Sequence, residues 1–252
     1  MIGILLSLAV IVLIIVKRGS IVAGFAASAN AKGKTDKALR LYNLADKLGG
    51  MNYHSKIGYG YFLLKNAYLR EARAEFVKLS MNPKLKDDQK QQVKSLLALV
   101  TWKEGQIDDA IEMLQETMES YVTSMVYQSL GLLYIIKKDK EKALPFCLEA
   151  YEYNSDDTVI MDNLAEAYVL MGETEKAMKT YEELLKREPH FPDAYYGYGM
   201  LLIQDGKRRE GLSYLEKALD KKFSFLSALP RERVEAIYYA QRQIEIEDKN
   251  NI

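Results

Sequence analysis

Cysteine, histidine and tryptophan are scarce in this sequence of 252 residues, which holds one cysteine, two histidines and one tryptophan. A single cysteine cannot form a disulfide within the chain, and so few ligands cannot make the usual structural zinc sites. His54 and His190 lie far apart, and neither has a cysteine or a carboxylate at ligand spacing. We therefore expect no bound metal and no cofactor, and we interpret both histidines as surface residues.

An excess of charge is also missing, because 35 basic side chains balance 35 acidic ones. Proteins that bind nucleic acid usually present a basic surface to its phosphates, so we expect no nucleic-acid partner. Proline is rare as well, with five residues, whereas apolar residues make up 48% of the chain. This composition favours helices over sheets and is sufficient for a stable core.

One long uncharged run does occur, at residues 2–16 (IGILLSLAVIVLIIV), and it ends at Lys17 and Arg18. A helix over this run would rise about 22 Å, which is less than the roughly 30 Å of a bilayer core. The next residues are uncharged as far as Ala31, and the long side chains of Lys17 and Arg18 can reach the headgroup region. We therefore predict an N-terminal transmembrane anchor within residues 1–20.

Basic residues follow this run and none precedes it, so the positive-inside rule places the N-terminus outside and the rest of the chain in the cytoplasm. A cleaved secretory signal is the alternative, because Ala29, Asn30 and Ala31 have the small-x-small form that a signal peptidase accepts. A signal peptide normally has its positive charge before the apolar run, which favours the uncleaved, single-pass anchor. A helix buried in a soluble core is a third interpretation.

A pattern of about 34 residues recurs along the rest of the chain. In the two repeats that match best, equivalent residues lie 34 positions apart: Leu164 and Tyr198, Ala165 and Gly199, Tyr168 and Leu202, Gly172 and Gly206. The pattern gives six repeats, which start near residues 19, 53, 91, 124, 158 and 192. A polar insertion at residues 80–90 accounts for the longer interval between the second and third.

Each recurring residue type has a physical role in a pair of packed helices. Small residues such as Ala165 and Ala177 let two helix axes approach closely, and Gly172 supplies the turn between them. Tyr168 and Tyr181 fill the space between successive pairs. For the second helices of three repeats we predict N-caps at Asp108, Asp139 and Thr174.

This pattern resembles the tetratricopeptide repeat (TPR), whose repeat is two antiparallel helices, and the resemblance covers residues 19–225. It implies an all-α fold, a right-handed α-solenoid of about six TPR helix pairs that follows the N-terminal transmembrane helix. Residues 226–252 carry an apolar stripe of Val234, Ile237, Tyr238 and Ile244, which predicts a capping helix and a tail after the last pair.

No group of residues in the sequence resembles a catalytic site. Cys147 occupies the position at which other repeats have Tyr181 or Leu215, so we interpret it as a core residue. The glycines at 58–60 and 197–199 follow no predicted strand, as a phosphate-binding loop would require. Acidic residues alternate with basic ones at helical spacing, which is typical of a solvated outer face. We therefore predict that the protein is not an enzyme.

The TPR resemblance also implies that the first helix of each repeat lines a concave face. The residues that we predict to bind a partner there are Ile57, Tyr61, Leu64, Leu99, Trp102, Leu132, Ile135, Ile136, Val169, Tyr196 and Met200. The same face includes Asp162, Glu166 and Asp193, but its lining is mostly apolar and aromatic. TPR domains that hold acidic peptide tails need several basic residues here, and only Lys65 and Lys103 could serve.

An apolar groove suits an amphipathic helix or an extended apolar segment of a protein or peptide partner. The alternative is that neighbouring helices, or the chain's own C-terminal helix, fill the groove. The chain is similar to membrane-anchored TPR proteins of bacterial type, some of which add a metal-binding module that needs paired cysteines. We therefore predict a membrane-anchored scaffold for protein interactions, with an extracytoplasmic TPR accessory factor for envelope assembly or secretion as the alternative.

Overall fold

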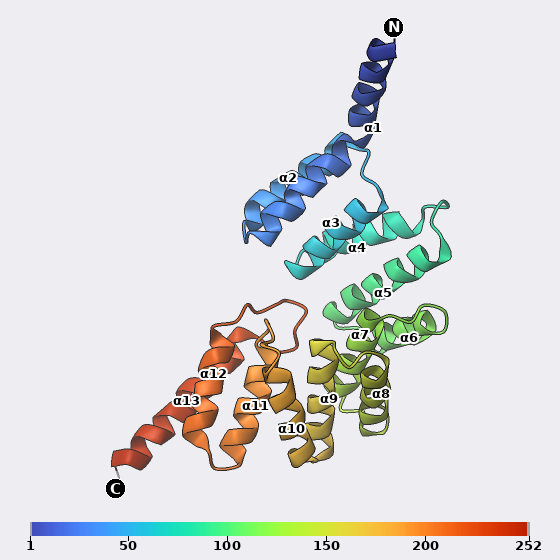
Figure 1. Cartoon of the computed structure of the whole chain (residues 1–252). Helices are drawn as coiled ribbons and strands as arrows, with labels where there is room; N and C mark the ends of the chain where they lie inside the picture. Colours follow the sequence, from blue (N-terminus) through green and yellow to red (C-terminus); the bar gives the residue numbers. More distant parts are fainter. Residues whose placement is uncertain (1, 251–252) are drawn as a thin grey trace. The chain divides into compact units, whose positions relative to one another are not determined.

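A computed structural model describes the backbone of residues 2–250 and the side chains of residues 15–247, and this part of the chain contains helices and no strand (Figure 1). The helices are α1 (Ile2–Ala31), α2 (Thr35–Leu48), α3 (Tyr53–Lys65), α4 (Leu69–Ser80), α5 (Asp87–Lys103), α6 (Ile107–Met118), α7 (Ser124–Ile136), α8 (Lys140–Tyr153), α9 (Thr158–Met171), α10 (Thr174–Leu185), α11 (Asp193–Gln204), α12 (Arg208–Leu219) and α13 (Arg231–Asn250). The all-α fold predicted from the sequence is confirmed.

The chain divides within α5 into two parts, one that ends at Val100 and one that begins at Thr101. We call them the N-terminal part and the C-terminal part and describe each by itself. In both, successive helices pack as antiparallel pairs, with α3 against α4 in the first and α9 against α10 in the second. The predicted repeat starts at 53, 124 and 158 coincide with the first residues of α3, α7 and α9.

In the N-terminal part, α1 packs along α2 through small residues. Ala23 and Ala26 of α1 and Ala38 and Ala45 of α2 are buried, which lets the two helices approach closely. Further along α1 towards its N-terminus, Gly19 lies against the end of α2, where a Cβ atom on it would be 2.2 Å from the carbonyl oxygen of Gly49. A side chain at this position would therefore force the main chains of the first helix pair apart.

The predicted transmembrane anchor falls almost wholly on residues whose side chains are outside the described part, since that part begins at Ile15. Within the described residues, no helix is both long enough and apolar enough to cross a membrane.

In the C-terminal part, the core lies between the pairs α9–α10 and α11–α12. Ala165, Ala177 and Tyr181 are fully buried in one apolar cluster, which matches their predicted packing roles. Cys147 is also buried, and burial raises the pKa of its thiol to about 12, so it packs as a small apolar residue.

The turns between paired helices use left-handed backbone conformations. Gly105, Gly172 and Gly206 have φ angles of 94°, 77° and 80°, as expected for glycine in a tight turn. Lys138 takes up the same conformation in the α7–α8 turn, with a φ of 55°, although it has a side chain. This position is therefore strained.

The predicted N-caps are correct at one of three positions. The side chain of Asp139 accepts a hydrogen bond from the Lys142 amide at the start of α8. The N-cap of α10 is Glu173 and not Thr174, and that of α6 is Gln106 and not Asp108. Asp108 lies inside the first turn of α6, where its carboxylate pairs with Lys137. In both cases the cap is the residue directly after a left-handed glycine, Gly105 or Gly172, so the helix begins earlier than predicted.

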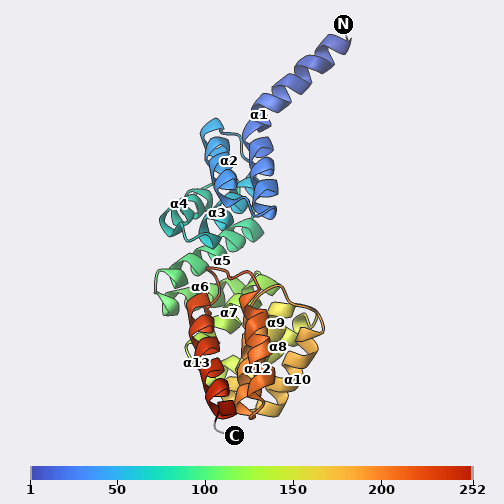
Figure 2. The same ribbon diagram turned by 90° about the vertical axis from the view of Figure 1, so that its left-hand side faces the viewer.

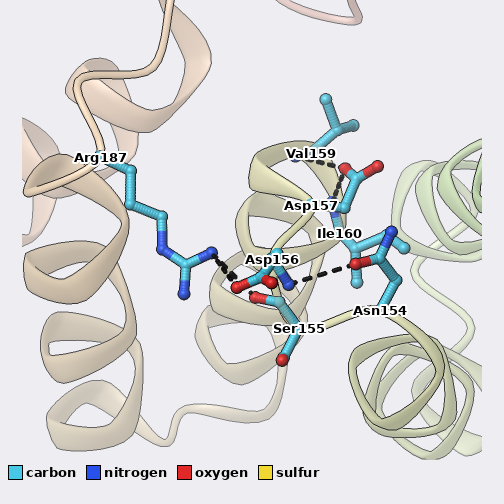
Figure 3. Close-up of polar contacts among 7 residues, drawn as sticks. All are labelled: Asn154, Ser155, Asp156, Asp157, Val159, Ile160 and Arg187. Carbon is cyan, nitrogen blue, oxygen red and sulfur yellow. Dashed lines mark hydrogen bonds and ion pairs between the residues drawn. The ribbon is translucent and has the colours of Figure 1, made fainter.

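A polar cap begins α9, and the turn that contains it contacts the end of α10 (Figure 3). The Asp157 carboxylate accepts hydrogen bonds from the amides of Val159 and Ile160, at 2.9 and 3.1 Å. Arg187, just after α10, donates a 3.0 Å hydrogen bond to the carbonyl oxygen of Ser155 in the same turn (Figure 3). These contacts fix the end of one repeat against the end of its neighbour.

The last helix, α13, packs against α12, beside which it runs in Figure 2. Val234 is fully buried there in a cluster with Tyr195, Ala218 and Leu229. Further along the predicted stripe, Ile244 is 37% exposed. Between them, Gln241 accepts a 3.3 Å hydrogen bond from Arg208 of α12, so α13 covers the last repeat most closely at its start and less closely towards its end.

Candidate functional site

The first helices α7, α9 and α11 of the C-terminal part enclose a cavity of about 170 Å³, together with residues that follow α12. Its apolar walls are Leu132, Ile135, Ile136, Tyr196 and Leu229. Its polar walls are Asp162, Asn163, Glu166, Asp193 and Arg233. We call it the acidic cavity, because three of these five polar residues carry carboxyl groups.

A second hollow, of about 580 Å³, lies next to it. Trp102, Lys103 and Ile136 form one side, and residues between α12 and α13 form the other. We call residues 223–230 the covering segment, since they contribute to both hollows. Trp102 is therefore not in an open groove, because the chain itself lies over it.

The ammonium group of Lys103 holds the covering segment in place. Its Nζ donates a 3.0 Å hydrogen bond to the carbonyl oxygen of Ser227, and it lies 3.9 Å from the centre of the Trp102 ring and 5.0 Å from that of Phe225. Contacts of a cation with aromatic faces are favourable, and more so when the cation is shielded from water. Burial lowers the pKa of Lys103 to about 8, although the negative charge of Asp193 opposes this shift.

Ser227 makes a second contact with the concave face. Its hydroxyl donates a 2.7 Å hydrogen bond to the Asp193 carboxylate at the start of α11. Burial raises the pKa of Asp193, while this hydrogen bond and the charge of Lys103 act in the opposite direction. The covering segment is thus attached to the groove at both Lys103 and Asp193.

Asp162, on α9, is the most unusual residue of the site. It is 7% exposed, and its Oδ1 atom accepts no hydrogen bond from any residue in the described part. Burial raises the pKa of its carboxyl group well above the ordinary value, and the negative charges of Asp193 and Glu166 raise it further. Among the described groups, no positive charge opposes these effects.

Glu166, one turn later on α9, is better compensated. Its carboxylate accepts a 3.0 Å hydrogen bond from the Tyr181 hydroxyl. Burial raises its pKa, whereas this hydrogen bond and the charge of Arg233 lower it.

The structure brings only some of the predicted partner-binding residues together. Leu132, Ile135, Ile136 and Tyr196 line the acidic cavity, and Trp102 lines the hollow beside it. Val169 is 39% exposed and Met200 is partly buried, and neither lines these two hollows.

The remaining four predicted residues belong to the N-terminal part. There Tyr61 is 37% exposed and Ile57 is partly buried. Leu64 and Leu99 are buried, so they pack inside the solenoid and are not available to a partner.

The sequence predicts a mostly apolar lining for the concave face, and so it understates the three acidic residues that lie there. A signal was present, because Asp162, Glu166 and Asp193 fall at inner positions of two successive repeats, where they become neighbours once the first helices stack. We find no group of three or more His, Cys, Asp or Glu residues in the described part that could hold a metal ion.

Comparison with known protein families identifies the repeat. Tetratricopeptide-repeat models match residues 158–201 in one case, and residues 126–157 and 192–220 in another. Residues 126–220 are tetratricopeptide repeats. The matched TPR segment contains α9 and α11 and most of the walls of the acidic cavity.

Solved structures show that the TPR solenoid extends over most of the chain. A tetratricopeptide repeat protein from Parabacteroides merdae ATCC 43184 has a TM-score of 0.70 at 13% identity, covering 89% of this chain and 84% of that one. A thermophilic TPR protein of Thermus thermophilus has a TM-score of 0.53 at 18% identity, covering 89% of this chain and 99% of that one. At these identities the likeness shows the fold alone, and the predicted TPR solenoid is confirmed.

Among curated proteins, the mouse (Mus musculus) aspartyl/asparaginyl beta-hydroxylase is 33% identical over 64 residues. The match covers 25% of this chain and 9% of the hydroxylase. The chain thus spans a small fraction of that relative, and the hydroxylation in its name is a property of that protein.

Proposed function

We propose that the protein is a non-enzymatic scaffold that binds a partner polypeptide on the concave face of its C-terminal part. The observation that carries this proposal is the pair of hollows beside Trp102 and Ile136. Apolar walls formed by Leu132, Ile135 and Ile136 would bury apolar residues of a partner, which is the main source of affinity in such grooves.

The covering segment is an internal occupant of this face. It is held at its middle by polar contacts of Ser227 with Lys103 and Asp193, at 3.0 and 2.7 Å. A partner segment that enters the hollow of about 580 Å³ would lie between Trp102 and the covering segment. Binding would then require a shift of this short stretch and not of any TPR helix.

We also propose that residues 2–16 anchor the protein in a membrane, with the TPR array in the cytoplasm. The C-terminal half of α1 is built into the first helix pair, where Arg18 donates a 2.8 Å hydrogen bond to the carbonyl oxygen of Leu48. Ser20 donates to the Gly50 carbonyl oxygen and accepts from the Asn52 amide, at 3.1 and 2.8 Å. An anchor continuous with the first repeat would raise the concentration of a bound partner near membrane machinery.

The packing of α1 argues against cleavage of a signal after Ala31. Such a cleavage would remove α1, which covers the buried residues Ala38, Tyr42 and Ala45 of α2. An extracytoplasmic accessory factor for envelope assembly or secretion is the second candidate. A reporter that is active only outside the cytosol, fused to the C-terminus, distinguishes them, because activity of that reporter would contradict the cytoplasmic orientation.

The scaffold proposal is tested by quantitative affinity purification from solubilised membranes. The wild type is compared with a double variant, Trp102→Ala with Ile135→Glu, and with Leu148→Glu as a matched control. Leu148 lies on the second helix α8 and is 39% exposed, so a charge there leaves the concave face unchanged. We expect specific co-purifying proteins to be lost only with the double variant. Equal recovery with all three proteins would contradict the proposal.

A further inference from the structure

Three carboxyl groups from two neighbouring first helices meet at the acidic cavity. Asp162 and Glu166 lie one turn apart on α9, and Asp193 is the first residue of α11. Two of the three have a cation nearby, since Arg233 offsets the charge of Glu166 and Lys103 that of Asp193. When the three carboxyl groups, Arg233 and Lys103 are all ionised, one negative charge is left without a compensating positive charge.

The uncompensated group is Asp162. Its Oδ1 atom is buried and has no hydrogen-bond partner within the described part of the chain, and the charges next to it are carboxylates of the same sign. A buried polar atom without a partner is costly, so native proteins seldom retain one unless another molecule satisfies it. Asp162 also lines the cavity of about 170 Å³, so a group inside that cavity can reach it.

The remaining walls define the shape of that group. Leu132, Ile135 and Leu229 offer apolar contact beside the carboxylate. A cation on an alkyl stem fits both surfaces, because its charged end can donate to a carboxylate while the stem packs on apolar side chains.

We propose that the acidic cavity binds the basic side chain of a partner polypeptide, an arginine or a lysine, with Asp162 as its principal acceptor. This inference rests on the proposed function and names the chemistry of the partner. The partner segment would lie along the apolar concave face and would insert one basic residue into the cavity. The TPR groove would then select an apolar peptide with a cation at one position, the reverse of grooves that hold acidic tails.

Binding of such a cation is linked to protonation. A positive charge in the cavity stabilises the ionised form of Asp162, so a cation that binds while Asp162 is protonated releases a proton. The other ionisable groups that face Asp162 are Glu166 on α9, Tyr181 on α10 and Asp193 on α11, with Arg233 on α13 and Lys103 on α5 as the nearby cations. Binding should therefore tighten as the pH rises through the range in which Asp162 ionises.

The test uses the full chain in detergent and two probes, N-acetyl-arginine amide and N-acetyl-citrulline amide. Both are blocked at the amino and carboxyl groups, so that only the side chain can carry a charge. Citrulline has nearly the shape of arginine but no charge. By calorimetric titration at neutral pH we expect the arginine probe to bind at least about tenfold more tightly than the citrulline probe. We also expect Asp162→Asn to weaken binding of the arginine probe by a similar factor. Asp156→Asn is the matched control, because its carboxylate is exposed in the turn just before α9.

The inference would be overturned if the two probes bind equally or if neither binds. It would also be overturned if Asp162→Asn binds the arginine probe as tightly as the wild type does. The probe comparison needs only the wild type, so it stands even if the variant folds poorly. Tighter binding of free spermidine than of the arginine probe would indicate a free polyamine as the ligand and would also overturn it.

If these tests fail while the double variant Trp102→Ala with Ile135→Glu still loses its partners, the scaffold proposal stands without the basic residue. If the arginine probe binds but no partner depends on the groove, the scaffold proposal fails.

Discussion

Lys103 on α5 donates a 3.0 Å hydrogen bond to the carbonyl oxygen of Ser227, although the two residues are 124 positions apart in the sequence. This contact brings the covering segment over Trp102, the only tryptophan of the chain. It makes one lysine responsible for both the position of that segment and the electrostatic surroundings of the indole ring. Several properties of the concave face can therefore be measured through Trp102.

Trp102 fluorescence should titrate with Lys103. The ammonium group lies 3.9 Å from the centre of the indole ring, and burial lowers its pKa to about 8. Loss of the charge removes the cation–π contact, so selective excitation of tryptophan should show a transition with a midpoint near pH 8. The transition should disappear in Lys103→Met. A transition that persists in this variant would show that another group reports on the indole.

The same lysine affects stability in a defined pH range. Its pKa is lowered from 10.5 in the unfolded chain to about 8 in the folded one, so between these values the unfolded chain binds more protons. The contribution of Lys103 to the free energy of unfolding therefore rises with pH across this window. Urea denaturation should show a smaller increase over this range for Lys103→Met than for the wild type. An equal increase in both proteins would exclude Lys103 as the cause.

Asp162→Asn should stabilise the protein, by about 1–3 kcal/mol near neutral pH. The folded-state pKa of Asp162 is raised, so above the ordinary value of 3.8 the folded chain holds a proton that the unfolded chain loses. Stability of the wild type thus decreases as the pH rises above 3.8, and the asparagine variant lacks this loss. Chemical denaturation at several pH values measures the difference in free energy of unfolding between the variant and the wild type. This difference should become smaller towards pH 4. A variant that is less stable than the wild type at neutral pH would contradict the unpaired state of Asp162.

Two glycines of α1 should respond in opposite ways to alanine. A Cβ atom on Gly19 would lie 2.2 Å from the Gly49 carbonyl oxygen, whereas one on Gly24 would have no atom within 4 Å. Gly24→Ala should stabilise the chain by about 1 kcal/mol through helix propensity. Gly19→Ala should destabilise it by about 1–3 kcal/mol because the main chains must move apart. Thermal unfolding that shifts in the same direction for both variants would contradict this packing of α1.

Glycine in place of Lys138 should relieve backbone strain in the α7–α8 turn. Lys138 has a φ of 55°, which is unfavourable for a residue with a side chain, while Gly172 has a φ of 77° in the equivalent turn of the next repeat. Lys138→Gly should therefore stabilise the protein by up to about 1 kcal/mol, and Gly172→Ala should destabilise it by about 1–2 kcal/mol. Denaturant midpoints measure both changes, and destabilisation by Lys138→Gly would be the contrary result.

Much of the solenoid could be predicted because its packing repeats in the sequence. Small residues recur at 34-residue intervals at the positions of Ala165 and Ala177, which are both buried, and glycine recurs 34 residues after the left-handed Gly172. Helix starts were less predictable, as Thr174 shows, since a cap depends on which residue ends the preceding turn.

The site itself was only partly predictable. The covering segment has no helical periodicity, so nothing in the sequence places Ser227 against Lys103. Asp162 and Asp193 are likewise distant along the chain, and their shared environment depends on the stacking of α9 and α11. The apolar positions Leu132 and Ile135 were predictable, because TPR spacing alone directs them to the concave face.

Site-specific photo-cross-linking in intact membranes tests the scaffold claim most directly. A photoreactive amino acid replaces Ile136, which lines both hollows of the concave face, and in a second protein it replaces Lys179 on the exposed side of α10. We expect a discrete cross-linked polypeptide from position 136 only, and its loss when Ile135→Glu is added. Cross-linking that is absent at 136, or equal at 136 and 179, would contradict partner binding on this face.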